Sequence, residues 1–279
     1  MQSSNPVFTR TDGFNGKNQA GYATFGDTTY AGPPTHTGSG TGRMSIDSVV
    51  QKSGITLGVL VLVAAATWIG TGNVITTDAF GAAIVDPGKA QTLYTLSIVG
   101  AFGGFILSLV NSFKKEISPA LVIAYAALEG LFVGAMSKVF QLQFGGGIVT
   151  GAVLGTIAAV AGTLAAYKFF DIQVGNKFRK WVIGMMFGFV AVTLLDVLLG
   201  AFGNSIGFNG FGGLGLIMSV VGLGLGVLML ILDFDFVERG IAAGLPERES
   251  WRAAFGLTVT IIWIYIELLR ILAILRGND

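Results

Sequence analysis

Long apolar stretches recur along the chain after residue 54, separated by short polar connections. Each is close to ~20 residues long, which lets a helix rising about 1.5 Å per residue cross a hydrocarbon core of about 30 Å. The stretches are continuous and do not alternate between apolar and polar residues, so strands are not expected. We predict an all-α membrane protein with seven spanning helices, over residues 54–72, 92–112, 119–138, 146–167, 181–202, 211–233 and 252–275.

The first fifty residues differ from the rest because Gly, Ser, Thr, Asn and Pro predominate there. Such a segment buries too little apolar area to offset the entropy of ordering, so we expect a disordered tail. It lacks the basic start and the continuous apolar run of a signal peptide, so we expect the segment to remain on the protein and in the cytoplasm. Two roles stay open for it, a solvated tail or a docking or phosphorylated segment. The expected organisation is a polar cytoplasmic tail over 1–50 and a transmembrane domain over 51–279.

The composition agrees with a membrane protein and argues against several other classes. Charged residues make up 12% of the chain, about half the usual share of a soluble domain. Lys and Arg number 17 against 16 Asp and Glu, which leaves no basic excess for nucleic acid. The chain has no Cys, and His36 in the tail is its one histidine. Disulfides, thiolate sites and a His-based catalytic centre are therefore not expected, and we predict a non-enzyme without a cofactor.

The distribution of Lys and Arg between the spans predicts the orientation. Thirteen lie in the tail and the connections on its side, including Lys114 and Lys115, and four lie on the other side. This asymmetry places the N-terminus in the cytoplasm and, after seven crossings, the C-terminus outside. A re-entrant last segment would instead return the C-terminus to the cytoplasm. We expect a multi-pass protein of the cell membrane, the inner membrane in a bacterium.

Pairs of glycines four residues apart recur within the spans. On membrane helices this spacing lets neighbouring backbones approach closely, so it predicts tight helix packing. The pairs and triplet are Gly100/Gly104, Gly130/Gly134, Gly147/Gly151/Gly155, Gly184/Gly188 and Gly222/Gly226.

Four acidic residues fall within or at the end of the spans, where a charge costs several kcal/mol. Glu129 lies near the middle of the third span and is expected to face the bundle, either in a pore or in a structural hydrogen bond. Asp196 lies late in the fifth span, where a wetted helix end is the favoured interpretation, and a pore role and a structural role also stay open for it. Asp233 closes the sixth span after unbroken apolar sequence, and Glu267 lies within the seventh.

The last two spans form an antiparallel hairpin, across which Asp233 and Glu267 could meet. Two neighbouring acids disfavour double ionisation, so such a pair would share a proton and act as a proton sensor. Asp235 lies about 200° from Asp233 around the helix and is expected to pair with Arg239 one turn later. The cations expected to compensate the acid pair are Lys114, Lys115 and Arg270; a local ion pair between Glu267 and Arg270 is the alternative.

Three segments carry a resemblance to a known family. The sixth span ends in Leu232-Asp233-Phe234-Asp235-Phe236, and the seventh contains Tyr265-Ile266-Glu267-Leu268-Leu269-Arg270. Together with the third span from Pro119 to Gly130, they resemble the transmembrane Bax-inhibitor-motif family in its bacterial YccA-like branch. The opening Ser4-Asn5-Pro6-Val7-Phe8 is similar to an actinobacterial type. The resemblance covers about residues 50 to 276.

This resemblance implies six helices around a central one and, as in some members, a pH-sensitive calcium leak. The gating acids would be Asp233 and Glu267, which are also candidate transient Ca²⁺ contacts because hard oxygen ligands suit that ion. The chain departs from the family in having Glu267 instead of aspartate, a longer connection between the acids, and Asn111 and Ser112 where the second helix has an arginine. The alternative is a non-conducting regulator that binds a membrane protease or a stress complex.

Overall fold

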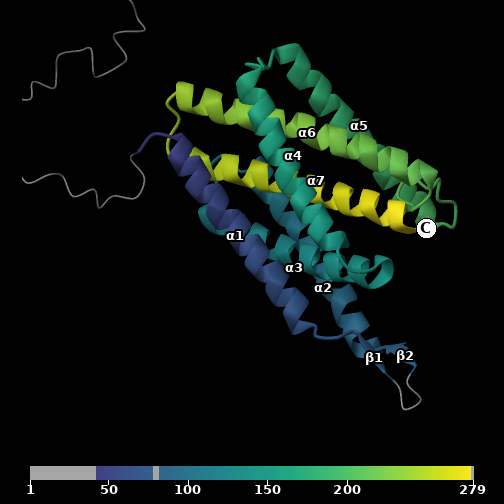
Figure 1. Cartoon of the computed structure of the whole chain (residues 1–279). Helices are drawn as coiled ribbons and strands as arrows, with labels where there is room; N and C mark the ends of the chain where they lie inside the picture. Colours follow the sequence, from purple (N-terminus) through teal and green to yellow (C-terminus); the bar gives the residue numbers. More distant parts are fainter. Residues whose placement is uncertain (1–41, 78–81, 278–279) are drawn as a thin grey trace, which may run out of the picture. The chain divides into compact units, whose positions relative to one another are not determined.

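The computed structural model describes residues 42–77 and 82–277. Of the tail predicted over residues 1–50, residues 1–41 lie outside these ranges. Within them the chain forms seven helices, which confirms the seven predicted spans (Figure 1). All seven are long and apolar enough to cross a membrane. Their bounds are α1 Ile46–Gly70, α2 Pro87–Phe113, α3 Pro119–Phe144, α4 Ile148–Phe169, α5 Asn176–Ala201, α6 Gly213–Ala242 and α7 Glu249–Gly277.

Several helices extend beyond the apolar stretches that predicted them. α1 begins at Ile46, inside the segment expected to be tail, because Ser45 and Ser48 form a reciprocal capping box there. α6 continues to Ala242, past the end predicted at residue 233. Hydropathy reports only the part of a helix that matches the hydrocarbon core, whereas polar residues continue the helix outside it. α7 is one unbroken helix of 29 residues, as expected of a full crossing and not of a re-entrant segment.

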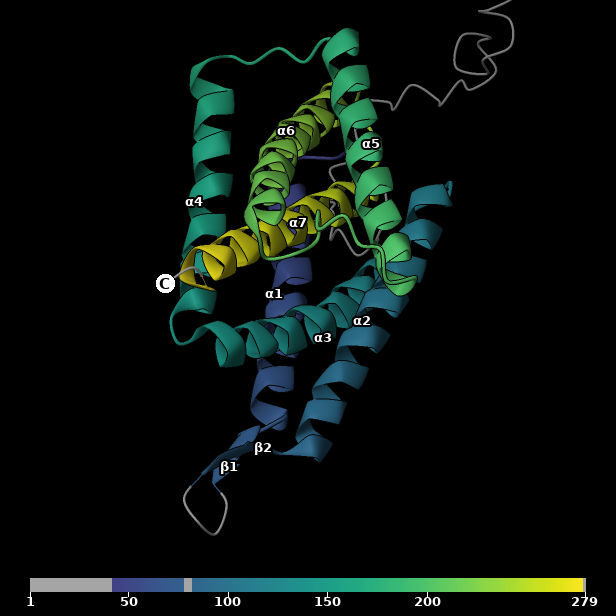
Figure 2. The same cartoon turned by 90° about the vertical axis from the view of Figure 1, so that its right-hand side faces the viewer.

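A short two-stranded ribbon lies between α1 and α2 and was not predicted. β1 covers Ile75–Thr77 and β2 covers Ala83–Val85, paired antiparallel with Thr76 opposite Ile84. The ribbon is too short to give the alternating pattern by which strands are recognised in a sequence. It lies at the end of α1 and the start of α2 (Figure 2).

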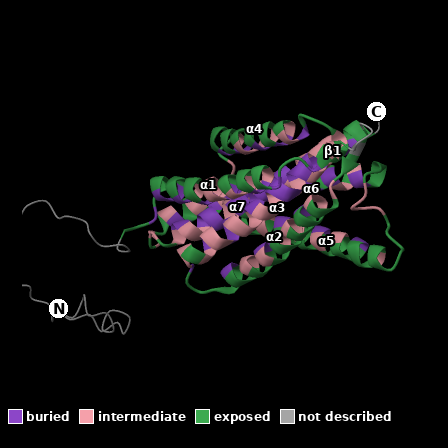
Figure 3. Cartoon of the chain, turned by 90° about the horizontal axis from the view of Figure 1, so that it is seen from below, coloured by how far each residue is buried: buried purple, intermediate pink, exposed green. Residues whose placement is uncertain are grey.

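α7 is the central helix of the bundle. It packs against α1, α3, α4 and α6, while α2 packs mainly on α3 and α5 mainly on α6. Figure 3 shows buried residues concentrated along α7 and exposed ones on the outer helices. The family arrangement of six helices around one is therefore found in a modified form, in which α2 and α5 form an outer layer over α3 and α6.

Most of the glycine pairs lie at close helix contacts, as predicted. A Cβ atom on Gly134 would lie 2.5 Å from the carbonyl oxygen of Ala64 in α1, and one on Gly100 would lie 2.5 Å from the backbone nitrogen of Phe132 in α3. The prediction is wrong for Gly184 and Gly188, which have no described atom within 4 Å of such a Cβ because they lie on the open side of α5. There the spacing occurs without a partner helix among the described residues.

The segment ahead of α1 is tied to the connection between α6 and α7. The Met44 amide donates to the Leu245 carbonyl at 2.8 Å, and the Glu247 amide donates to the Gly42 carbonyl at 2.8 Å. From α1, Lys52 Nζ reaches to 2.8 Å from Glu247 Oε1 in the connection, and the hydroxyls of Ser48 in α1 and Ser250 in α7 are 2.7 Å apart. We call this set of contacts the N-terminal clasp.

Candidate functional site

Asp233 faces α7 from the second half of α6. Its carboxylate oxygen Oδ2 accepts a hydrogen bond of 2.6 Å from the hydroxyl of Thr260. On the same side, a Cβ on Gly256 would lie 3.3 Å from Oδ1, so the absence of a side chain there leaves room for the carboxylate. Asp233 thus turns toward α7 while Asp235 points elsewhere, but Asp233 is only half-buried and Asp235 is the more buried of the two acids.

Glu267 faces α6 from the middle of α7 and is 5% exposed. A Cβ on Gly222 would lie 2.7 Å from its Oε1, so glycine is needed at that position for the side chain to lie across α6. Its Oε2 lies 3.5 Å from Nη1 of Arg270, which also donates through Nη2 to the carbonyl of Phe208 at 3.1 Å. The local ion pair considered above as an alternative is therefore present.

The structure does not bring Asp233 and Glu267 together. Glu267 lies opposite Gly222, eleven residues before Asp233 on α6, and Asp233 binds Thr260, seven residues before Glu267 on α7. At 1.5 Å per residue the two acids are separated by about 10–16 Å along the helices. The buried side chains of Leu230 and Ile264 occupy the section between them. The predicted direct contact is corrected, because the register of the hairpin is set by the helix lengths and the connection and not by the acids.

Asp235 is buried and joins three parts of the chain through ion pairs with two half-exposed arginines. Arg239 Nε lies 2.8 Å from its Oδ1, which confirms the predicted pair. Arg179 of α5 lies 2.6 Å from its Oδ2, and Arg239 also donates to the carbonyl of Val174. Because Asp235 is only 5% exposed, both arginines are needed to compensate its charge. Sequence reasoning counted Arg179 only as a topology signal and missed its role here.

Asp196 is buried, and the wetted helix end favoured from the sequence is wrong. Its carboxylate accepts backbone hydrogen bonds from Ile206, Gly207 and Asn209 at 2.7, 3.1 and 2.8 Å. The Ser205 hydroxyl and the Asn209 side-chain amide add two more. The side chain therefore holds the connection between α5 and α6 in place and has a structural role, one of the two that were open for it.

Glu129 lies in the interface between α3 and α2. A Cβ on Gly104 would lie 2.5 Å from its Oε1, so the carboxyl group rests on the glycine face of α2. Tyr125 lies one turn earlier on α3 and interacts with it. Glu129 therefore lies beside a polar group, as expected, at a half-buried position away from the two acids of the α6–α7 hairpin.

The lysines expected to compensate the acids lie elsewhere. The side chains of Lys114 and Lys115 are exposed, and their backbone carbonyls accept hydrogen bonds from Arg252. Asn111 is buried and donates to the carbonyl of Leu121 at 3.3 Å, so it ties α2 to α3. Of the three predicted partners, Arg270 alone forms an ion pair with one of these acids within the described ranges.

Two polar contacts were not anticipated from the sequence. Lys138 of α3 is buried, and its ammonium group donates to the carbonyl of Trp68 and the hydroxyl of Thr71, both at 2.7 Å. The hydroxyls of Tyr265 and Ser137 are 2.6 Å apart and join α7 to α3. A lysine inside an apolar stretch was the available signal for the first contact, since a membrane-buried charge needs partners.

Comparison with known proteins agrees with this architecture. The family model for Bax inhibitor 1 like proteins matches residues 5–277. The chain is also 36% identical to an uncharacterized protein of Chlamydia muridarum (strain MoPn / Nigg) over 119 residues, which are 38% of this chain and 50% of that protein. The chain thus spans about half the length of this curated relative. With seven membrane-length helices and a family match over nearly its whole length, the chain belongs to the Bax inhibitor 1-like family of membrane proteins.

Proposed function

We propose that this protein is a cation leak of the cell membrane, with Ca²⁺ as the cation and with Asp233 and Glu267 as the controlling acids. The observation that carries the proposal is the placement of both carboxyl groups between α6 and α7. A charged group at membrane depth is costly unless it serves a pathway or a partner. Neither acid forms ion pairs with two arginines, as Asp235 does.

The section between the two acids supports a closed state. Leu230 and Ile264 are fully buried there, and a Cβ on Gly226 would lie 2.8 Å from the side chain of Ile264. This close packing leaves an apolar layer between the two carboxyl groups, and a hydrated ion does not cross such a layer at low cost. Opening would require α6 and α7 to separate at this level.

Arg270 serves as the counter-charge at one end of the path. Its guanidinium group lies 3.5 Å from Glu267 and also binds the Phe208 carbonyl, so it is held in place from the α5–α6 connection. A divalent cation would have to displace it to reach Glu267. A single carboxylate at each end of the path supplies few of the six to eight oxygen ligands that Ca²⁺ takes, so the proposed contacts with the ion are transient.

Flux measurements on the purified protein in liposomes test this function. We expect Ca²⁺ flux that changes between about pH 5 and about pH 8, because protonation removes the charge of each acid. Asp233→Asn and Glu267→Gln should each flatten this dependence, whereas Glu116→Gln, a surface carboxylate, should leave it unchanged. Since the acids lie two to three helical turns apart along α6 and α7, their effects on the logarithm of the flux should add in the double variant.

Two outcomes would contradict parts of this proposal. A double variant no more affected than either single variant would indicate one titrating unit and therefore direct coupling of the acids. A complete absence of flux from the unaltered protein at every pH would overturn the leak. It would favour the non-conducting regulator of a membrane protease or stress complex.

The proposed orientation has its own test, which the absence of Cys makes direct. Single cysteines at Val85 of β2 and at Lys115 lie at opposite ends of α2 and are exposed. In intact spheroplasts, an impermeant maleimide should label Val85→Cys and should reach Lys115→Cys only after lysis. The reverse labelling would overturn a cytoplasmic N-terminus.

A further inference from the structure

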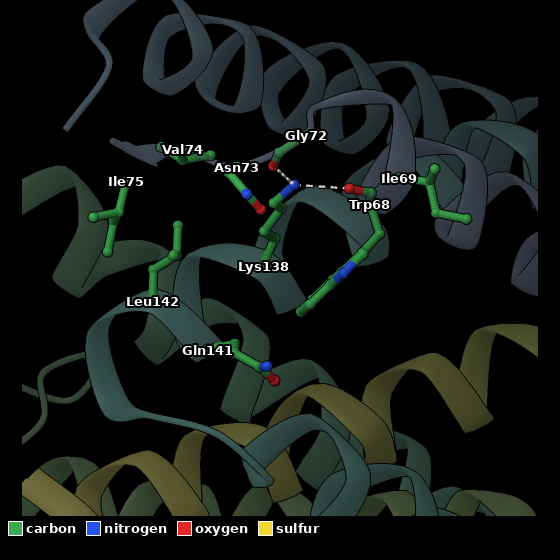
Figure 4. A pocket seen from close by; sticks show the side chains of 9 residues that line it. All are labelled: Trp68, Ile69, Gly72, Asn73, Val74, Ile75, Lys138, Gln141 and Leu142. Carbon is green, nitrogen blue, oxygen red and sulfur yellow. Dashed lines mark hydrogen bonds between the residues drawn. The ribbon is translucent and has the colours of Figure 1, made fainter. Parts of the chain in front are cut away.

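A cavity of about 330 Å³ with mixed polar and apolar walls lies where α1 ends, beside α3 and the start of β1 (Figure 4), and we call it the polar cavity after its lysine and amide side chains. Its walls include the indole of Trp68, the side chains of Asn73 and Gln141, and Lys138. In Figure 4 the Lys138 side chain reaches the carbonyl oxygens of Trp68 and Gly72 at the end of α1. The helix end is thereby fixed, and a positive charge is placed in the cavity wall.

A second ammonium group lies beside this cavity, on the backbone of its wall residue Asn73. Lys89 of α2 donates to the carbonyl of Asn73 at 2.8 Å, next to the Gly72 carbonyl used by Lys138. Lys89 Nζ lies 3.9 Å from Asp86, and no other acidic side chain within residues 42–77 and 82–277 pairs with either lysine. Lys138 uses its three donors on α1, whereas the side chain of Lys89 is 41% exposed and retains donors. The described part of the site is therefore positive.

An apolar cavity of about 410 Å³ adjoins the polar one and shares Trp68 with it. It lies between α1 and α4, with walls that include Val61 and Val153, and it reaches Tyr265 of α7. Its hydroxyl groups are satisfied within the protein, since Tyr265 pairs with Ser137 and Thr156 donates to the Ala152 carbonyl. The cavity therefore offers an occupant an apolar wall in the part of the bundle that lies in the membrane.

We propose that these two cavities together bind one anionic phospholipid. One acyl chain occupies the apolar cavity between α1 and α4, and the phosphate group lies at the polar cavity, where Lys89 donates to it and Lys138 adds charge. Lipid chains surround the bundle at the depth of the apolar cavity, and an exposed lysine attracts the phosphate group of an anionic lipid. Trp68 separates the two parts, as aromatic side chains do at membrane interfaces. This site is separate from the acids of the proposed leak.

Native mass spectrometry of the purified full chain, with equal amounts of phosphatidylglycerol and phosphatidylcholine, tests this site. We expect the unaltered protein to retain phosphatidylglycerol preferentially. Val153→Trp and Val61→Trp, which fill the apolar cavity from opposite walls, should weaken retention about tenfold. Lys89→Gln should reduce the preference for phosphatidylglycerol about threefold, the effect of one exposed charge pair.

Matched controls make each result decisive. Leu198→Trp places the same bulk on the exposed side of α5, and Lys115→Gln removes an exposed lysine at the other end of α2; both should retain the lipid normally. The proposal is overturned if Val153→Trp and Val61→Trp match Leu198→Trp, or if Lys89→Gln keeps the full preference. Displacement of the lipid by inorganic phosphate alone would also overturn it, since it would indicate a free-anion site. Ca²⁺ flux measured on the same variants separates a failure here from a failure of the leak.

Discussion

Replacing Asp196 by alanine is expected to lower the free energy of unfolding by about 3 kcal/mol. The substitution leaves three backbone N–H groups of the α5–α6 connection without their acceptor. Each unsatisfied donor costs roughly 1–3 kcal/mol when buried, and partial access of water to this connection reduces the total. Asp196→Asn should also destabilise the protein, because the NH2 group of asparagine cannot accept the backbone hydrogen bonds that one carboxylate oxygen accepts.

Chemical unfolding in detergent and hydrogen exchange of residues 206–209 measure this effect. The amides of Ile206, Gly207 and Asn209 should exchange faster in Asp196→Ala than in the unaltered chain. Asp171→Asn provides the control, because Asp171 is an exposed residue in the α4–α5 connection and asparagine tolerates its positive φ of 45°. Equal stability of Asp196→Ala and Asp171→Asn would contradict the structural role of Asp196.

Gly134→Ala and Gly184→Ala are expected to change stability in opposite directions. At Gly134 the new methyl group would lie 2.5 Å from the Ala64 carbonyl oxygen and 2.9 Å from the Ala64 Cα, so the backbones of α1 and α3 must move apart. Such overpacking costs about 1–3 kcal/mol. At Gly184 the methyl group meets no described atom within 4 Å, and the higher helix propensity of alanine adds up to about 1 kcal/mol.

Unfolding titrations of the two variants against the unaltered protein provide the measurement. A loss of stability in Gly184→Ala comparable to that in Gly134→Ala would mean that α5 has a close partner at this face. The pair therefore also tests whether the open side of α5 faces lipid.

Hydropathy was sufficient to predict the seven helices, because a continuous apolar stretch of membrane length has few other structures available to it. The continuous apolar character of the helices gave no information on which helices contact one another. A helix that is apolar all round has no face that marks its neighbour, so nothing in the pattern distinguished Gly134, packed on α1, from Gly184, which is open. The small-residue spacing permits a close approach but does not supply the partner.

The acids illustrate a similar limit. That Asp233 and Asp235 point in different directions follows from helix geometry alone, and the structure agrees. The separation of Asp233 from Glu267 depends instead on the register between α6 and α7. The sequence does not specify this register, because both helices are apolar on all faces. The partners of Asp196 follow it by nine to thirteen residues, and only the folded connection brings their N–H groups to one carboxylate.

The N-terminal clasp gives the bundle a mechanical linkage. Residues 42–44 are joined by backbone hydrogen bonds to residues 245–247, which connect the two helices that carry Asp233 and Glu267. A tension applied to the chain ahead of Gly42 would therefore load this connection before it reached α1. The force would be transmitted through the paired backbones of residues 42–44 and 245–247 to the start of α7. The Lys52–Glu247 ion pair, which joins α1 to the same connection, would oppose the movement.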